Sequence, residues 1–173
     1  MKSLPEIVRD NRPQAIIGID PAISCGWCVG DVGRPAAIRE SGTWNLEPRG
    51  SKHPGIRYQR LRSELRLLGS CHAPLALIVY ESGFHRGQHA TQSHWGLVGI
   101  ILAVAAELGD VLTLPVNPST LKTHAGAADK DHMIRMARSL FRREPATSDE
   151  ADAMLLYDYG RMHLLQSERE GQC

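Results

Sequence analysis

The sequence predicts an α/β fold in which a five-stranded mixed sheet, with three antiparallel strands followed by parallel ones, is flanked by helices. Two observations lead to this prediction. Continuous apolar runs at residues 15–19 and 75–80 are typical of strands covered on both faces. Elsewhere, apolar residues recur at helical spacing. The predicted order is three strands, a helix, a strand, a helix, a strand and further helices, which fits a single sheet with helical crossovers.

The first strand, residues 15–19, ends at Asp20, where Pro21 blocks its continuation. Residues 26–30 and 35–44 flank a turn-forming stretch and predict a hairpin. The later strands cover residues 75–80, which Glu81 follows, and residues 111–116.

Residues 54–69 predict an amphipathic helix with a basic outer face, and residues 91–108, apolar almost all round, predict a buried helix. Two final helices are predicted at 129–141 and 148–166, the second with Ser148 as its N-cap. A helical crossover lets the strand at residue 75 lie parallel to the first strand. Asp20 and Glu81 should therefore emerge at the same edge of the sheet.

The composition predicts one domain over residues 1–173, with a core at about 15–166, since 173 residues that are 42% hydrophobic fit one ordinary core. No apolar run approaches the length that spans a bilayer, and the N-terminus lacks the hydrophobic region of a signal peptide. Four scattered cysteines do not suggest a secreted disulfide framework. We therefore expect a soluble, cytoplasmic protein.

The net charge of +1 conceals basic clusters. Residues 49–66 contain six cations, among them Arg57 and Arg60, against one anion, Glu64. Such a patch can bind a phosphate backbone, but a solvated helix face has the same composition.

Cys25 and Cys28 have the C-x-x-C spacing of a zinc or redox site. On an extended strand, however, residues three apart point to opposite faces, and a redox pair normally opens a helix. Packing is the better interpretation of both cysteines.

Carboxylates, by contrast, stand at element ends in three separate places. Asp20 and Glu81 follow strands, and Asp149 and Asp152 lie three residues apart on one face of the last helix. Clustered carboxylates repel one another, and a hard divalent cation with oxygen ligands relieves that repulsion. For any single acid, a cap or surface role is the alternative. Together they indicate a metal site, at which two Mg²⁺ ions about 4 Å apart could support phosphodiester hydrolysis.

In this order the motifs resemble those of the RuvC-type Holliday junction resolvases of the RNase H-like superfamily. The segments that carry the resemblance are GIDPAISCGWCV, LIVYESGF and SDEADAMLL, with the basic stretch NPSTLKTHAGAADK between the last two. The resemblance covers about residues 15–165. It implies a metal-dependent endonuclease, acting as a homodimer, that nicks paired strands of four-way DNA junctions.

The resemblance also implies roles for individual residues. Asp20, Glu81, Asp149 and Asp152 would be the catalytic acids and would bind Mg²⁺, for which Mn²⁺ substitutes. Lys122 and Lys130 match basic residues that contact DNA near the scissile phosphate and assist catalysis, although the stretch between them is shorter here than in typical relatives. Phe84 lies at the position of a wedge aromatic. The positive charges of Arg57 and Arg60 in the basic cluster, and of Arg86 after Glu81, make these arginines further expected DNA contacts, independently of the resemblance.

Several alternatives stay open from the sequence. Another RNase H-like nuclease, acting on RNA/DNA hybrids or flaps, would carry similar acids, and a non-catalytic module could bind branched DNA without cleaving it. Phe84 could instead pack in the core. His85 and His89 have zinc spacing only if their segment is helical, and His124 could be a solvent-exposed residue. The apolar segment from Thr91 is a candidate dimer interface.

Overall fold

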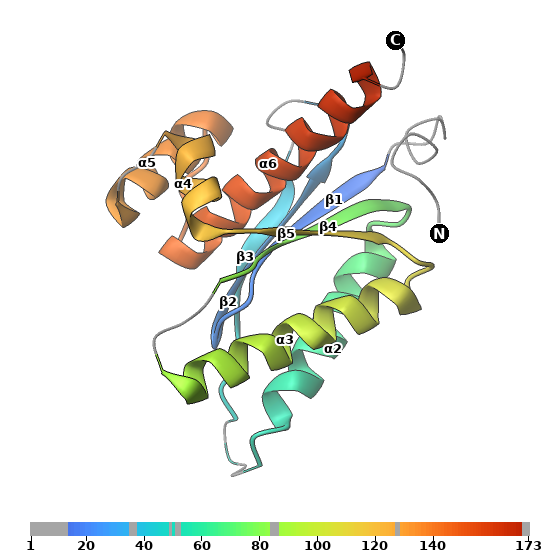
Figure 1. Ribbon diagram of the computed structural model, residues 1–173, viewed down its shortest axis with the longest axis vertical. Coiled ribbons are helices and arrows are strands. Elements are labelled where there is room, and N and C mark those ends of the chain that lie inside the picture. Colours follow the sequence, from blue (N-terminus) through green and yellow to red (C-terminus); the bar gives the residue numbers. More distant parts are fainter. Residues whose placement is uncertain are drawn as a thin grey trace.

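A computed structural model describes residues 14–34, 38–48, 50, 53–83, 87–126 and 129–170 of the chain. Its centre is a five-stranded sheet in the order β3-β2-β1-β4-β5 (Figure 1). Strands β1 to β3 pair antiparallel, and β4 and β5 continue the sheet parallel to β1, as the sequence predicts. The strands are β1 (Ala15–Asp20), β2 (Ser24–Asp31), β3 (Ile38–Asn45), β4 (Leu75–Glu81) and β5 (Leu112–Val116).

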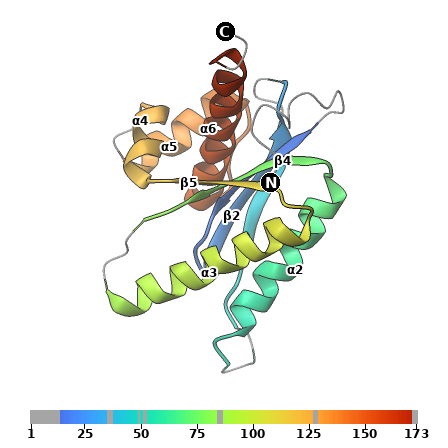
Figure 2. The ribbon, with the colours of Figure 1, turned by 45° about the vertical axis from the view of Figure 1, so that its right-hand side comes forward.

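Helices cover both faces of the sheet (Figure 2). One face carries α2 and α3 over a buried cluster that includes Ile17 and Ile78. The opposite face carries α4, α5 and α6 over a second cluster that includes Ile16 and Tyr157. The helices are α2 (Ile56–Cys71), α3 (Gln88–Glu107), α4 (Pro118–Ala125), α5 (Lys130–Phe141) and α6 (Ser148–Glu170).

The two cysteines of the C-x-x-C segment point to opposite sides of the sheet. Cys25 is fully buried in the cluster under α2 and α3, and Cys28 is fully buried in the cluster under α6. Both lie on β2, so the alternation of side chains along a strand separates them. The prediction that Cys25 and Cys28 point to opposite faces of the strand is confirmed, and both side chains pack in the core.

Helix α3 is not buried all round, so that part of the prediction is wrong. Leu97 and Ile101 lie in the core, but Trp95 and Leu102 on another side are 43% and 44% exposed. Sheet and α2 together cover only part of the helix surface, which leaves an apolar strip uncovered. Within the described part of the chain, no helix is both long and apolar enough to cross a membrane.

Helix α4 is an element that the sequence reading missed. Its signals are local ones: Asn117 precedes it in extended conformation, Pro118 occupies the first turn, and Gly126 ends it with a left-handed φ of 62°. Only Leu121 and Ala125 are buried. With two buried residues, the helix carries too little apolar periodicity to be recognised from pattern alone.

Candidate active site

Asp20 and Glu81 are neighbours because of the register between β1 and β4. Ile19 pairs with Tyr80 across the two parallel strands, and the next residue on each strand is Asp20 and Glu81, respectively. Both carboxylates therefore leave the sheet at its carboxyl edge, as predicted. The starts of α3 and α6 and the end of β5 lie on the same side of the molecule (Figures 1 and 2).

A glycine contact brings the start of α6 to this edge. Gly26 on β2 pairs with Asp20 across the antiparallel ladder, and a Cβ added to Gly26 would lie 1.8 Å from the carbonyl oxygen of Asp149. No other residue type leaves room for this approach. A Cβ on Gly18 would likewise meet the carbonyl oxygen of Ala153 at 2.3 Å, so the first turns of α6 lie directly on β1 and β2.

The first turn of α6 is held by a capping arrangement centred on Thr147 and not on Ser148. The Thr147 hydroxyl accepts a hydrogen bond from the backbone N–H of Glu150 (3.0 Å), and the Glu150 carboxylate accepts one from the N–H of Ala146 (2.7 Å). Thr43 and Ser41 of β3 bond to the Thr147 hydroxyl (2.7 Å) and the Glu150 carboxylate (2.6 Å). The prediction of Ser148 as N-cap is therefore wrong by one residue. These contacts tie the helix start to the sheet.

The acids at this edge are half-buried and repel one another, and this perturbs their protonation. Burial, and then the charges of Glu81, Asp152 and Asp149, raise the pKa of Asp20 well above its ordinary value. Burial, followed by repulsion from Glu81 and Asp149, raises the pKa of Asp152 to about 6. Burial also raises the pKa of Glu81. The four acids therefore act electrostatically as one cluster.

Two lysines oppose this negative charge. Lys130 lowers the pKa of Asp20, Glu81 and Asp152, while Lys122 lowers that of Glu81 and Asp152. Lys122 lies on α4, and Lys130 opens α5, whose N-cap Asp129 accepts a hydrogen bond from the N–H of His132 (2.8 Å). The shorter connection between the two lysines thus still brings Lys130 within electrostatic reach of the acids.

The four acids supply oxygen donors only, which suits a hard divalent cation such as Mg²⁺. Among the described residues, no three His, Cys, Asp or Glu side chains are gathered around a single point as they would be around a metal ion. The backbone places the four acids together, but their side chains do not converge, in keeping with their mutual repulsion. Burial raises the pKa of Asp20, Glu81 and Asp152, and neighbouring acids add to the shift at Asp20 and Asp152. A divalent cation would offset this unfavourable negative charge, and in that respect the residues fit a metal.

The arginines expected on the DNA surface lie at the start of α2. Arg57 is half-buried and donates a hydrogen bond to the Ser93 hydroxyl of α3 (2.9 Å), and Arg60 donates to the carbonyl oxygen of Glu47. The chain leaves β3 at the carboxyl edge of the sheet, so these arginines lie near that edge. Phe84, Arg86 and His85 lie outside the described residues.

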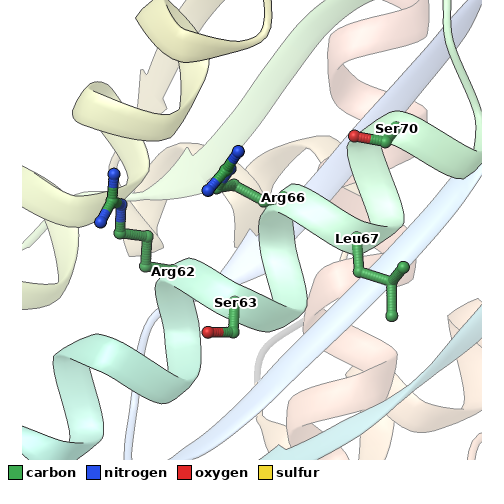
Figure 3. A pocket seen from close by; sticks show the side chains of 5 residues that line it. All are labelled: Arg62, Ser63, Arg66, Leu67 and Ser70. Carbon is green, nitrogen blue, oxygen red and sulfur yellow. The ribbon is translucent and has the colours of Figure 1, made fainter.

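Farther along α2, two arginines are engaged with α3. Arg62 and Arg66 form ion pairs with Glu107 at 2.7 and 3.3 Å. They line a shallow pocket on α2 together with Ser63, Leu67 and Ser70 (Figure 3). This helix packs on the face of the sheet opposite α6. The pocket is therefore distinct from the acidic cluster.

The histidines behave differently from one another. His89 is exposed in the first turn of α3, whereas His94 is buried, with Nδ1 3.2 Å from the carbonyl oxygen of Pro21. His124, for which solvent exposure was an open alternative, is half-buried and hydrogen-bonds through Nε2 to Asp158 of α6 at 2.9 Å. The sequence reading missed Asp158, and only the apolar surroundings of this acid in the α6 pattern could have drawn attention to it.

No model of a known protein family matches the chain. Individual curated proteins do. The chain is 36% identical to the crossover junction endodeoxyribonuclease RuvC of Anaeromyxobacter dehalogenans strain 2CP-1 over 150 residues, covering 82% of this chain and 77% of that protein. It is 32% identical to the RuvC of Anaeromyxobacter sp. strain Fw109-5 over 152 residues, covering 81% and 69%.

Solved structures share the fold. RuvC of Thermus thermophilus in complex with a Holliday junction substrate superimposes with a TM-score of 0.72 at 21% identity, covering 87% of this chain and 97% of that one. The yeast mitochondrial Holliday junction resolvase Ydc2 gives a TM-score of 0.63 at 17% identity, covering 96% and 87%. These likenesses confirm the RNase H-like fold. Together with the curated relatives, they lead to one conclusion: the chain belongs to the RuvC family of crossover junction endodeoxyribonucleases.

Proposed function

We propose that this protein is a Holliday junction resolvase, which nicks paired strands of a four-way DNA junction by metal-dependent phosphodiester hydrolysis. The observation that carries the proposal is the backbone geometry that brings the four acid-bearing positions of β1, β4 and α6 to one edge of the sheet. A protein that only bound DNA would gain nothing from carboxylates that repel both one another and the phosphates. Membership of the family supports the same activity.

In this proposal Asp20, Glu81, Asp149 and Asp152 hold Mg²⁺, with Mn²⁺ able to replace it. When bound, a pair of such ions would polarise the attacking water and stabilise the departing 3′ oxygen. Lys122 and Lys130 bring positive charge to the rim of the cluster, where it offsets the negative charge that develops on the phosphate. The backbone contacts of Gly26 and Gly18 keep α6 and its two acids in place against the sheet.

We further propose that the protein works as a homodimer joined through α3. The uncovered strip of this helix includes Trp95 and Leu102, two of the most exposed large apolar side chains in the described part of the chain. Exposed Gly99 and Ala106 continue the strip at helical spacing. A two-fold dimer would present two active sites to the two symmetry-related strands of a junction. Sedimentation of Leu102→Glu should show a monomer, whereas Leu67→Glu, on the exposed side of α2, should remain a dimer.

DNA contacts are proposed for Lys122, Lys130, Arg57 and Arg60, which surround the carboxyl edge, and for Phe84 and Arg86 in the segment after β4. Contacts with phosphates release counterions, so junction affinity should fall steeply with salt concentration. Affinity that did not change with salt would place the DNA elsewhere.

The deciding experiment compares cleavage of a synthetic four-way junction with cleavage of an RNA/DNA hybrid duplex, both in Mg²⁺. We expect paired nicks in the junction and none in the hybrid. Asp20→Asn should bind the junction but not cleave it, while Asp110→Asn, an exposed turn residue at the far end of α3, serves as the charge-matched control and should cleave normally. Cleavage of the hybrid alone would refute the resolvase assignment, and activity retained in Asp20→Asn would refute the metal role.

A further inference from the structure

A buried charged network joins α4 to α6 beyond the acidic cluster. His124 of α4 donates from Nε2 to Asp158 Oδ2 at 2.9 Å, since an ionised carboxylate only accepts. Arg161, one turn further along α6, donates to the other oxygen of the same carboxylate at 3.0 Å. The side chains of Asp158 and Arg161 are each only 9% exposed. A buried ion pair of this kind is costly to disrupt, so its geometry is well defined.

The carboxylate of this network remains ionised. Burial alone would raise the pKa of Asp158, but hydrogen bonds from His124 and Arg161 outweigh burial and leave the pKa below its ordinary value. The His124 ring also meets the ring of Tyr159 edge-on, with centroids 5.3 Å apart and an interplanar angle of 89°. The imidazole is therefore held both by a charged partner and by an aromatic neighbour on α6.

The position of His124 on α4 matters because of where Lys122 lies. An α-helix turns about 100° per residue, so Lys122 and His124 lie roughly 160° apart around the axis of α4. The buried pair Leu121 and Ala125 occupies the surface between them. His124 therefore faces Asp158, while Lys122 projects from the other flank, and its charge acts on Glu81 and Asp152.

Apolar packing alone constrains this helix weakly. Helix α4 has eight residues, and Leu121 and Ala125 are its buried members. Two side chains aligned along one helix face form a ridge about which the helix can roll. The hydrogen bond between His124 and Asp158 lies on one flank of that ridge and prevents the helix from rolling. Any roll would move Lys122, which lies on the other flank.

We propose that the His124–Asp158–Arg161 network is a positioning device that sets the roll of α4 and thereby aims Lys122 at the acids of the active edge. This inference rests on the proposed function, because it assigns His124 a role in junction cleavage through Lys122. His124 is thus a positioning residue that acts without touching the DNA.

The test measures single-turnover cleavage of a four-way junction at saturating protein, well below the melting temperature of every variant. His124→Ala should cleave about ten- to a hundredfold more slowly, the penalty expected for a misplaced catalytic group. His124→Gln should recover most of the rate, because its amide nitrogen is separated from Cα by the same number of bonds as Nε2 and donates likewise. His132→Ala, a half-buried histidine of α5, is the matched control and should cleave at the wild-type rate.

A double-mutant cycle separates positioning from general stability. If His124 acts through Lys122, His124→Ala should cause no further loss in a Lys122→Met background. An equal loss in both backgrounds, or a wild-type rate in His124→Ala, would overturn the inference.

Hydrogen exchange provides a readout that needs no DNA. The amides of α4 should exchange faster in His124→Ala than in wild type or His124→Gln. Unchanged exchange would also overturn the inference. Junction cleavage by the wild type tests the proposed function by itself, whereas the His124 variants test the positioning role. The proposed function and the further inference can therefore fail separately.

Discussion

Asp152→Asn should stabilise the metal-free protein at neutral pH while abolishing its proposed activity. Asp152 lies in the first turns of α6, half-buried and beside other acids. Burial is the largest cause of its raised pKa, and repulsion from Glu81 and Asp149 adds to it. An asparagine has nearly the same shape as the protonated acid and carries no charge. The substitution therefore removes the unfavourable negative charge of Asp152 and keeps the packing of the side chain.

The size of the effect follows from linkage. The pKa of Asp152 rises from 3.8 in the unfolded chain to about 6 in the folded protein, and each pKa unit corresponds to about 1.36 kcal/mol. Ionised Asp152 should thus lower the free energy of unfolding by up to about 3 kcal/mol at pH 7.5. As the pH falls through 6, the folded protein takes up a proton that the unfolded chain does not, and the penalty shrinks to about 1 kcal/mol at pH 4.5.

Thermal melting in EDTA measures this directly. For a chain of this length, about 3 kcal/mol corresponds to a rise in Tm of roughly 6–12 °C at pH 7.5, and the rise should be about a third as large at pH 4.5. Asp110→Asn, which removes a charge from an exposed turn, should leave Tm unchanged at both pH values. A rise of the same size at both pH values would show that packing, and not charge, was responsible. No rise at all would refute the electrostatic argument.

Three further predictions follow from the same edge of the sheet. Mg²⁺ should increase the free energy of unfolding of the wild type by about 2.7 kcal/mol at one hundred times Kd and so raise its Tm. The increase should be smaller in Asp152→Asn, and thermal melts in a Mg²⁺ series check it. Gly26→Ala should lose cleavage, because its Cβ would lie 1.8 Å from the carbonyl oxygen of Asp149 and must displace the start of α6; the junction assay, with Gly33→Ala in open space as control, tests this. Thr147→Ala should lower stability by about 1 kcal/mol through loss of the cap, measured by urea unfolding against Ser148→Ala.

Much of the scaffold around the site could be predicted from local sequence. The apolar runs that end in Asp20 and Glu81 mark strands whose next residue is acidic, and one helical crossover between them suffices to predict that they are parallel neighbours. The C-x-x-C segment could be resolved for the same reason: the period of a strand decides which way Cys25 and Cys28 point. These features depend on periodicity and chain order alone.

Other features depend on partners distant in the sequence, and these were missed. By residue type, Thr147 and Ser148 are equally good N-caps. The residue that caps α6 is Thr147, whose hydroxyl also contacts Thr43 on β3. His124 and Asp158 are separated by 34 residues, and no local pattern pairs them. For α3 the sequence left two alternatives open, burial against the sheet and a dimer interface, because an apolar helix has the same composition whether the sheet or another protein covers it.

The contacts that place the acids are contacts of the backbone. Asp20 is placed by its pairing with Gly26, and Asp149 by the approach of its carbonyl to the same glycine. Neither contact requires the acids to attract one another, and repulsion between acids contributes, after burial, to the raised pKa values of Asp20 and Asp152. Burial of the two hydrophobic clusters on either side of the sheet, together with the hydrogen bonds that tie α6 to β3, therefore holds the acids in place against this repulsion. Stability and activity then oppose each other at this edge, and acid-to-amide substitutions there should separate the two.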